Sequence, residues 1–179
     1  MTSYHHQLKV PKDRVAVLIG EKGKIKRKIE SETHTQMLVD SKEGDVTVMG
    51  DDGLQLLVAK NIVTAIARGF NPQVALQLLK IDYSFETFNI MDYAKTKNDL
   101  IRLKGRVIGE GGKSRRVIEE LTDCAVCVYG KTVSVIGEVE TLEFARRAID
   151  MLLTGSPHRN VYKWLEKQRR LLGQKRIEP

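Results

Sequence analysis

The sequence predicts an α+β fold made of two copies of one β-α-α-β-β-α unit. The first observation is a stretch of two apolar residues, Gly-x-x-Gly and a basic helical segment, which stands at 18–29 and again 89 residues later at 107–118. The second is that the elements expected around each copy follow one order, with a glycine after the third strand and another after the last helix. The length of 179 residues is enough for two small domains.

The first unit, residues 5–69, is expected to open with a short apolar strand that ends at Pro11. A helix from Arg14 to Ile19 then leads into the first glycine turn, and a basic helix begins at Gly23. Two strands joined by a polar turn and a longer helix complete the unit, with expected bounds of 36–39, 46–49 and 53–68. The last helix is expected to bury one apolar face, formed by Leu54, Leu57, Val58, Ile62, Ala65 and Ile66.

The second unit, residues 84–155, is expected to repeat this order. A strand comes first, and a helix leads into the second glycine turn, Gly109 to Gly112. A basic helix, two strands with a tighter turn and an amphipathic helix follow. The expected bounds, in chain order, are 85–91, 97–108, 113–121, 125–129, 132–136 and 140–153.

Residues 70–83 are expected to form a helical connector. Asn71 followed by Pro72 is typical of a helix start, because asparagine caps the helix and proline fits its first position. The apolar residues of the connector need a buried surface, so the two units are predicted to pack together. Residues 156–179 carry apolar residues at amphipathic spacing and are predicted to form a basic C-terminal helix and tail, with the helix docked on the body.

The distribution of charge indicates a polyanionic partner. The formal net charge is +7, but segments 20–29, 102–116 and 156–179 carry +4, +5 and +5, so the rest of the chain is acidic. Clusters of positive charge on an otherwise acidic chain are typical of nucleic-acid binding. Each cluster taken alone also fits a solvated helix face.

Enzymatic and metal chemistry have little support in the sequence. Cys124 and Cys127 lie three apart in an expected strand and face opposite sides, so packed cysteines are expected rather than a metal site. No nucleophile elbow or Walker loop is present, and Asp51-Asp52 is interpreted as helix capping. We therefore expect no enzyme and no cofactor. No segment approaches the ~20 apolar residues of a membrane helix and no signal-peptide pattern is present, which predicts a cytoplasmic protein without membrane contact.

The two glycine turns are the candidate binding sites. Glycines let a sugar–phosphate backbone approach closely, and the helix that follows offers free N–H groups to phosphate. The alternative is that each turn is only a tight corner between two helices. The predicted RNA-binding residues are Ile19, Gly20, Glu21, Lys22, Gly23, Lys24 and Arg27 in the first unit, and Ile108, Gly109, Glu110, Gly111, Gly112, Lys113, Arg115 and Arg116 in the second.

This order of elements, with Gly-x-x-Gly between the first two helices, resembles the type I K-homology (KH) family. The resemblance implies two KH domains that clamp about four nucleotides of single-stranded nucleic acid each. The segments 102–113 and 155–162 are more specific. They resemble the ribosome-assembly factors with two KH domains of the partner-of-Nob family, especially the short archaeal members, over about residues 7–172.

The narrower resemblance implies a non-enzymatic factor for small-subunit assembly that holds single-stranded ribosomal RNA near its 3′ end. As partners it implies the endonuclease that matures this RNA and a subunit of an archaeal translation initiation factor. Two other functions stay open: a KH scaffold for protein interactions linked to translation initiation, and a general regulator that binds single-stranded RNA. A monomer is expected, with most of the RNA affinity in the second unit, whose turn has three glycines.

Overall fold

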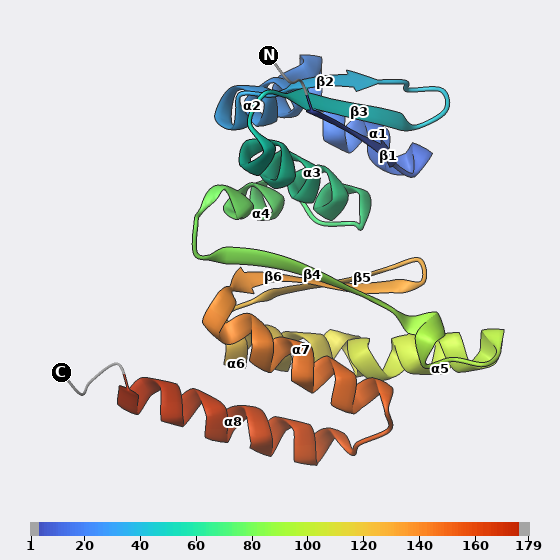
Figure 1. The fold of residues 1–179 in the computed structure, drawn as a ribbon. Helices are drawn as coiled ribbons and strands as arrows, with labels where there is room; N and C mark the ends of the chain where they lie inside the picture. Colours follow the sequence, from blue (N-terminus) through green and yellow to red (C-terminus); the bar gives the residue numbers. More distant parts are fainter. Residues whose placement is uncertain (1–3, 176–179) are drawn as a thin grey trace. The chain divides into compact units, whose positions relative to one another are not determined.

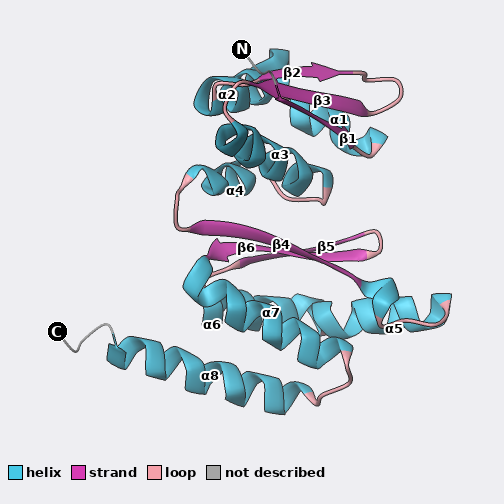
Figure 2. Cartoon of the chain, viewed as in Figure 1, coloured by secondary structure: helices cyan, strands magenta, loops and turns pink. Residues whose placement is uncertain are grey.

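The computed structural model describes residues 4–175, and the chain divides into two compact units after Tyr83. Each unit is a three-stranded sheet with helices packed on one face (Figure 1 and Figure 2). The strand orders are β1-β3-β2 and β4-β6-β5, so the third strand of each unit is central. The predicted α+β fold with two β-α-α-β-β-α units is confirmed.

The first unit contains the expected elements, and side-chain caps begin two of its helices. Asp52 Oδ1 accepts hydrogen bonds from the N–H groups of Leu54 (2.8 Å) and Gln55 (3.2 Å), which confirms the capping interpretation for this carboxylate. Asn71 caps the connector helix at Pro72 as predicted. With η marking single 3-10 turns, the elements are β1 (Tyr4–Lys9), α1 (Lys12–Ile19), η1 (Glu21–Gly23), α2 (Lys24–Thr33), β2 (Gln36–Val39), β3 (Asp45–Gly50), α3 (Gly53–Ala67), α4 (Pro72–Ala75) and η2 (Leu76–Leu79).

The second unit repeats the order and adds a long C-terminal helix. A capping box that the sequence analysis missed begins α5, in which the Thr96 hydroxyl and the Asp99 carboxylate each accept from the other residue's backbone N–H. The elements are β4 (Tyr83–Asn89), η3 (Ile90–Asp92), α5 (Lys97–Ile108), η4 (Glu110–Gly112), α6 (Lys113–Thr122), β5 (Ala125–Tyr129), β6 (Thr132–Glu138), α7 (Val139–Leu153) and α8 (His158–Lys175).

Side-chain hydrogen bonds repeat between the units along with the glycine turns. Glu30 and Glu119 each accept a bond from the N–H of the second residue of the following strand, at 2.7 and 2.9 Å. The buried hydroxyls of Thr33 and Thr122 each donate to the carbonyl four residues earlier, at 2.7 Å. In both pairs the residues lie as far apart in sequence as the glycine turns do. The two units therefore share one structural plan down to individual side chains.

The helix α3 buries only part of the predicted face, in which Ile62, Ala65 and Ile66 are fully buried as expected. Leu54 and Leu57 were expected in the core, but they are 69% and 44% exposed. Apolar residues surround α3 on nearly every side, so their spacing does not select the face that meets the sheet. The side chains that α3 does bury include Leu56, Ala59, Ile62, Val63 and Ile66.

The connector packs on the first unit. Its helix α4 and turn η2 contact α3, and η2 also contacts α2. Ala75 and Leu78 are buried there. Because these apolar side chains are covered by their own unit, they no longer argue for an interface between the units, whose packing together stays a prediction.

The C-terminal helix docks on the second unit as predicted. In Figure 1, α8 runs along α6 and α7, with which it makes many contacts. Its Val161 and Leu165 side chains are buried, and its Trp164 ring packs edge-on against Phe144 of α7, with 6.1 Å between ring centroids. Trp164 therefore serves packing. Residues 176–179 of the predicted tail lie outside the described residues.

Neither cysteine forms a disulfide, and Cys124 is a packing residue. Its position in the repeat corresponds to that of Thr35 in the first unit. Cys124 packs so closely against Gly137 that a Cβ on this glycine would collide with the cysteine sulfur. Burial raises the pKa of the Cys124 thiol, which disfavours the reactive thiolate. Within residues 4–175, no cluster of three His, Cys, Asp or Glu side chains could hold a metal, and no helix is long and apolar enough to cross a membrane.

Candidate nucleic-acid interface

The first glycine of each turn is required by the fold. Gly20 (φ 72°, ψ 174°) and Gly109 (φ 74°, ψ 169°) have a backbone conformation that is essentially restricted to glycine. A Cβ on Gly109 would lie 2.5 Å from the backbone nitrogen of Ser114, and one on Gly20 would lie 2.5 Å from Cγ1 of Ile25. The tight-corner alternative therefore explains this glycine fully, without a ligand.

The end of the second turn faces open space instead, and a Cβ on Gly23 of the first turn would meet only the Arg27 guanidinium, 3.7 Å away. Gly23 and Gly112 are left-handed, with φ of 75° and 77°, and so are the residues before them, Lys22 and Gly111. A Cβ on Gly111 or Gly112 would meet no atom within 4 Å. No side chain caps the helices α2 and α6 that begin here, although the N–H groups of their first residues, Lys24 and Lys113, donate to the carbonyls of Glu21 and Glu110. Packing does not account for this open, left-handed backbone at a helix N-terminus, which suits a phosphate group.

Exposed cations surround both turns. The predicted residues Lys22, Lys24 and Arg27 are exposed in the first unit, and Lys113, Arg115 and Arg116 are exposed in the second. Arg115 lies 3.8 Å from Glu119, a weak surface pair that leaves the guanidinium accessible. Glu21 and Glu110 are exposed in the turns themselves, and the half-buried Ile19 and Ile108 end the preceding helices. The structure thus gathers each predicted set at one turn, while the contact of each residue with RNA stays a prediction.

In each unit one arginine joins the helix before the glycine turn to the end of the helix that closes the β-α-α-β-β-α repeat, α3 or α7. Arg106 donates from Nε to the carbonyl of Leu152 (2.8 Å) and from Nη2 to that of Ser156 (2.5 Å). Arg14 makes the matching pair of bonds to the end of α3, although it lies one helical turn earlier in its own helix. These arginines satisfy carbonyls at helix C-termini, so Arg106 serves the fold although it lies in a basic cluster.

We expect Arg106→Met to destabilise the protein by about 2–3 kcal/mol, because two partly buried carbonyls lose a charged donor. Urea unfolding followed by circular dichroism measures this change. The control is Arg102→Met on the same helix, where an exposed surface pair with Asp99 is lost and the expected change is below about 0.5 kcal/mol. Equal losses in the two variants would contradict the anchoring role.

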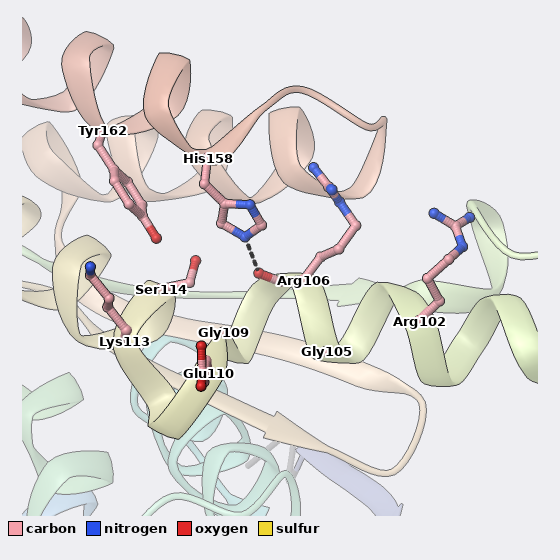
Figure 3. Close-up of a pocket in the computed structure, with 9 residues that line it drawn as sticks. All are labelled: Arg102, Gly105, Arg106, Gly109, Glu110, Lys113, Ser114, His158 and Tyr162. Atoms are coloured by element: carbon pink, nitrogen blue, oxygen red, sulfur yellow. Dashed lines mark hydrogen bonds between the residues drawn. The ribbon is translucent and has the colours of Figure 1, made fainter.

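A pocket of about 430 Å³ opens beside the second turn, on the side of α8 (Figure 3). The His158 ring donates from Nε2 to the carbonyl of Arg106 (2.8 Å), which fixes the start of α8 against the end of α5. The sequence analysis missed this pocket because it forms only when α8 returns to a turn about 50 residues earlier in the chain. Its lining comprises Arg102, Gly105 and Arg106 of α5, Gly109 and Glu110 of the turn, Lys113 and Ser114 of α6, and His158 and Tyr162 of α8.

Comparison with known families assigns both units. Residues 84–170 match the eukaryotic type KH domain (KH-domain type I), and residues 5–65 match the KH domain. The predicted resemblance to type I KH domains is therefore confirmed. The matched regions include both glycine turns and, in the second unit, most of α8.

Two related proteins indicate which family of KH proteins this chain resembles. A KH domain-containing protein of Methanocaldococcus jannaschii is 48% identical over 96% of this chain and 77% of its own. The RNA-binding protein PNO1 of Oryzias latipes is 33% identical over 60% of this chain, which spans less than half, 45%, of that protein.

A solved structure agrees over nearly the whole length. A chain from the crystal structure of an a/eIF2alpha–aDim2p–rRNA complex of Pyrococcus horikoshii is 41% identical, with a TM-score of 0.86 over 94% of this chain and 95% of that one. Such agreement in sequence and fold over both KH units confirms the narrower resemblance: the chain belongs to the PNO1/Dim2 family of proteins with two KH domains.

Proposed function

We propose that this protein is an RNA-binding factor for assembly of the small ribosomal subunit, which holds single-stranded ribosomal RNA near its 3′ end. The observation that carries the proposal is the second glycine turn, where Gly111 and Gly112 face open space at the uncapped start of the basic helix α6. Such a site binds a backbone by position and charge and requires no catalytic group. Membership of a family of RNA-binding KH proteins, rather than of enzymes, supports this reading.

Ribosomal RNA is the proposed ligand because the solved structure of a related protein contains it. The Pyrococcus horikoshii complex, whose chain aligns over nearly the full length of both proteins, contains rRNA together with aDim2p. The first unit would contribute a second, weaker contact through Lys22, Lys24 and Arg27. A cytoplasmic location and cooperation with the endonuclease that matures the same RNA belong to this proposal.

Single-stranded RNA should bind more tightly than a duplex of the same length, because a KH groove takes unstacked bases. With four to six phosphates contacted, the log of the affinity should fall against the log of salt concentration with a slope of about −3 to −4. Fluorescence anisotropy with a labelled RNA at several salt concentrations measures both quantities. Equal affinity for a blunt duplex would exclude the groove as the binding site.

A second candidate function is a protein scaffold linked to translation initiation. It has one specific observation in its favour, since the same Pyrococcus horikoshii complex also contains a/eIF2alpha. A pull-down of this protein with the purified initiation factor subunit, with and without RNA, separates the two functions. Binding of the subunit by a protein that shows no affinity for single-stranded RNA would favour the scaffold.

A further inference from the structure

The pocket between the second glycine turn and α8 contains a buried hydroxyl that the fold does not use. Ser114 is 1% exposed, and its Oγ has no hydrogen-bond partner among the described residues. A buried hydroxyl without a partner destabilises a fold. Folding alone does not call for a hydroxyl here, because the matching position of the first unit holds Ile25, an apolar side chain that packs against its glycine turn.

The surroundings of Ser114 favour an anion. Figure 3 shows its hydroxyl pointing toward α8, between Tyr162 and His158, while the Tyr162 hydroxyl points back toward α6. Lys113 and Arg102 line the same pocket, and the only acidic residue in the lining is Glu110. Ser114 also lies in the first turn of α6, whose N-terminus no side chain caps and whose dipole favours negative charge.

We propose that this pocket binds a phosphate group of the RNA strand, next to the backbone held by the second glycine turn. The proposal rests on the proposed function and extends it, because it makes α8 part of the RNA site. The RNA is favoured over a free phosphate as the source because Gly109 and Glu110 belong to both the turn and the pocket. Ser114 Oγ is buried, so side chains of the pocket lining must shift when the phosphate enters.

The first test separates binding from folding at Ser114. Ser114→Ala removes an unpartnered hydroxyl, so its melting temperature should be equal to or above that of the unchanged protein. Its affinity for the single-stranded RNA should nevertheless fall by about three- to tenfold, because a hydrogen bond to phosphate is lost. A variant with the affinity of the unchanged protein would show that the hydroxyl makes no contact with the RNA and would overturn the proposal.

The second test uses the charge of the pocket and a matched control. Arg102→Gln should weaken RNA binding and make the salt slope shallower by about 0.7, as expected for one lost phosphate contact. Lys97→Gln removes the same charge from α5 outside the pocket and should change the slope less. Equal effects of the two variants would indicate a general electrostatic attraction between α5 and the RNA, and would contradict a phosphate site in the pocket.

The source of the phosphate is tested by NMR, with inorganic phosphate in one titration and the RNA in another. The proposal expects the amide signals of Ser114 and Arg115 to shift with the RNA, and the Ser114→Ala variant to shift them less. Shifts with inorganic phosphate alone would assign the pocket to a free anion and overturn the link to RNA. If the unchanged protein binds no single-stranded RNA at all, the proposed function fails first, and that result is distinct from a failure at Ser114 alone.

Discussion

Replacing Gly111 and Gly112 by aspartate should reduce the affinity for single-stranded RNA by at least about 30-fold. Both positions face open space at the start of α6, so the new carboxylates would stand where the RNA backbone is proposed to lie. Like charges placed against each other in an interface cost several kcal/mol, and about 2 kcal/mol already corresponds to this loss. Anisotropy titration with a labelled single-stranded RNA at fixed salt measures the effect.

The fold should survive this double substitution. Aspartate tolerates the left-handed conformation, as Asp123 does at φ 55° in this chain. The matched control places aspartate at Lys22 and Gly23 of the first unit, and we expect a smaller loss of affinity there. An equal or larger loss from the first-unit variant would assign the main RNA contact to that unit instead.

Gly109→Ala should destabilise the protein by about 3–5 kcal/mol. The cost combines a backbone conformation that only glycine readily adopts with the contact of the new Cβ with the Ser114 backbone nitrogen. Urea unfolding at equilibrium gives the change, provided that the transition stays cooperative.

The control for Gly109 is Gly112→Ala in the same turn. That alanine would meet no neighbour within 4 Å, and its left-handed φ of 77° should cost only about 1–2 kcal/mol. The two variants thus divide the Gly-x-x-Gly turn into a glycine that the fold needs and one that leaves room for a ligand. Equal destabilisation by both would contradict this division.

Much of the fold could be predicted because local signals agreed with the tertiary structure. The strand Gln36–Val39 and the helix Lys97–Ile108 have the predicted bounds, since turn residues or a glycine delimit them. The motif that recurs at a spacing of 89 residues located both turns correctly. The prediction that Leu54 and Leu57 are buried was wrong, because α3 is apolar on nearly every side. Only the packing of the helix on the sheet selects which face is buried.

The pocket and the anchoring arginines could not be predicted in the same way. Arg106 looks in the sequence like any other cation of a basic cluster, and only the position of the end of α7 shows that its guanidinium is engaged. The pocket at Ser114 depends on α8 returning to the second turn. One sequence signal was available, because a serine replaces an isoleucine at the matching position of the repeat.

Binding of the unchanged protein to short RNAs tests the central claim most directly. Single-stranded fragments of equal length, tiled across the 3′ region of small-subunit ribosomal RNA and across an unrelated messenger RNA, are compared at one salt concentration. The account predicts at least about tenfold tighter binding to a segment of the ribosomal 3′ region than to any messenger fragment. Indistinguishable binding to the two sets would leave a general RNA-binding protein and contradict the ribosomal assignment.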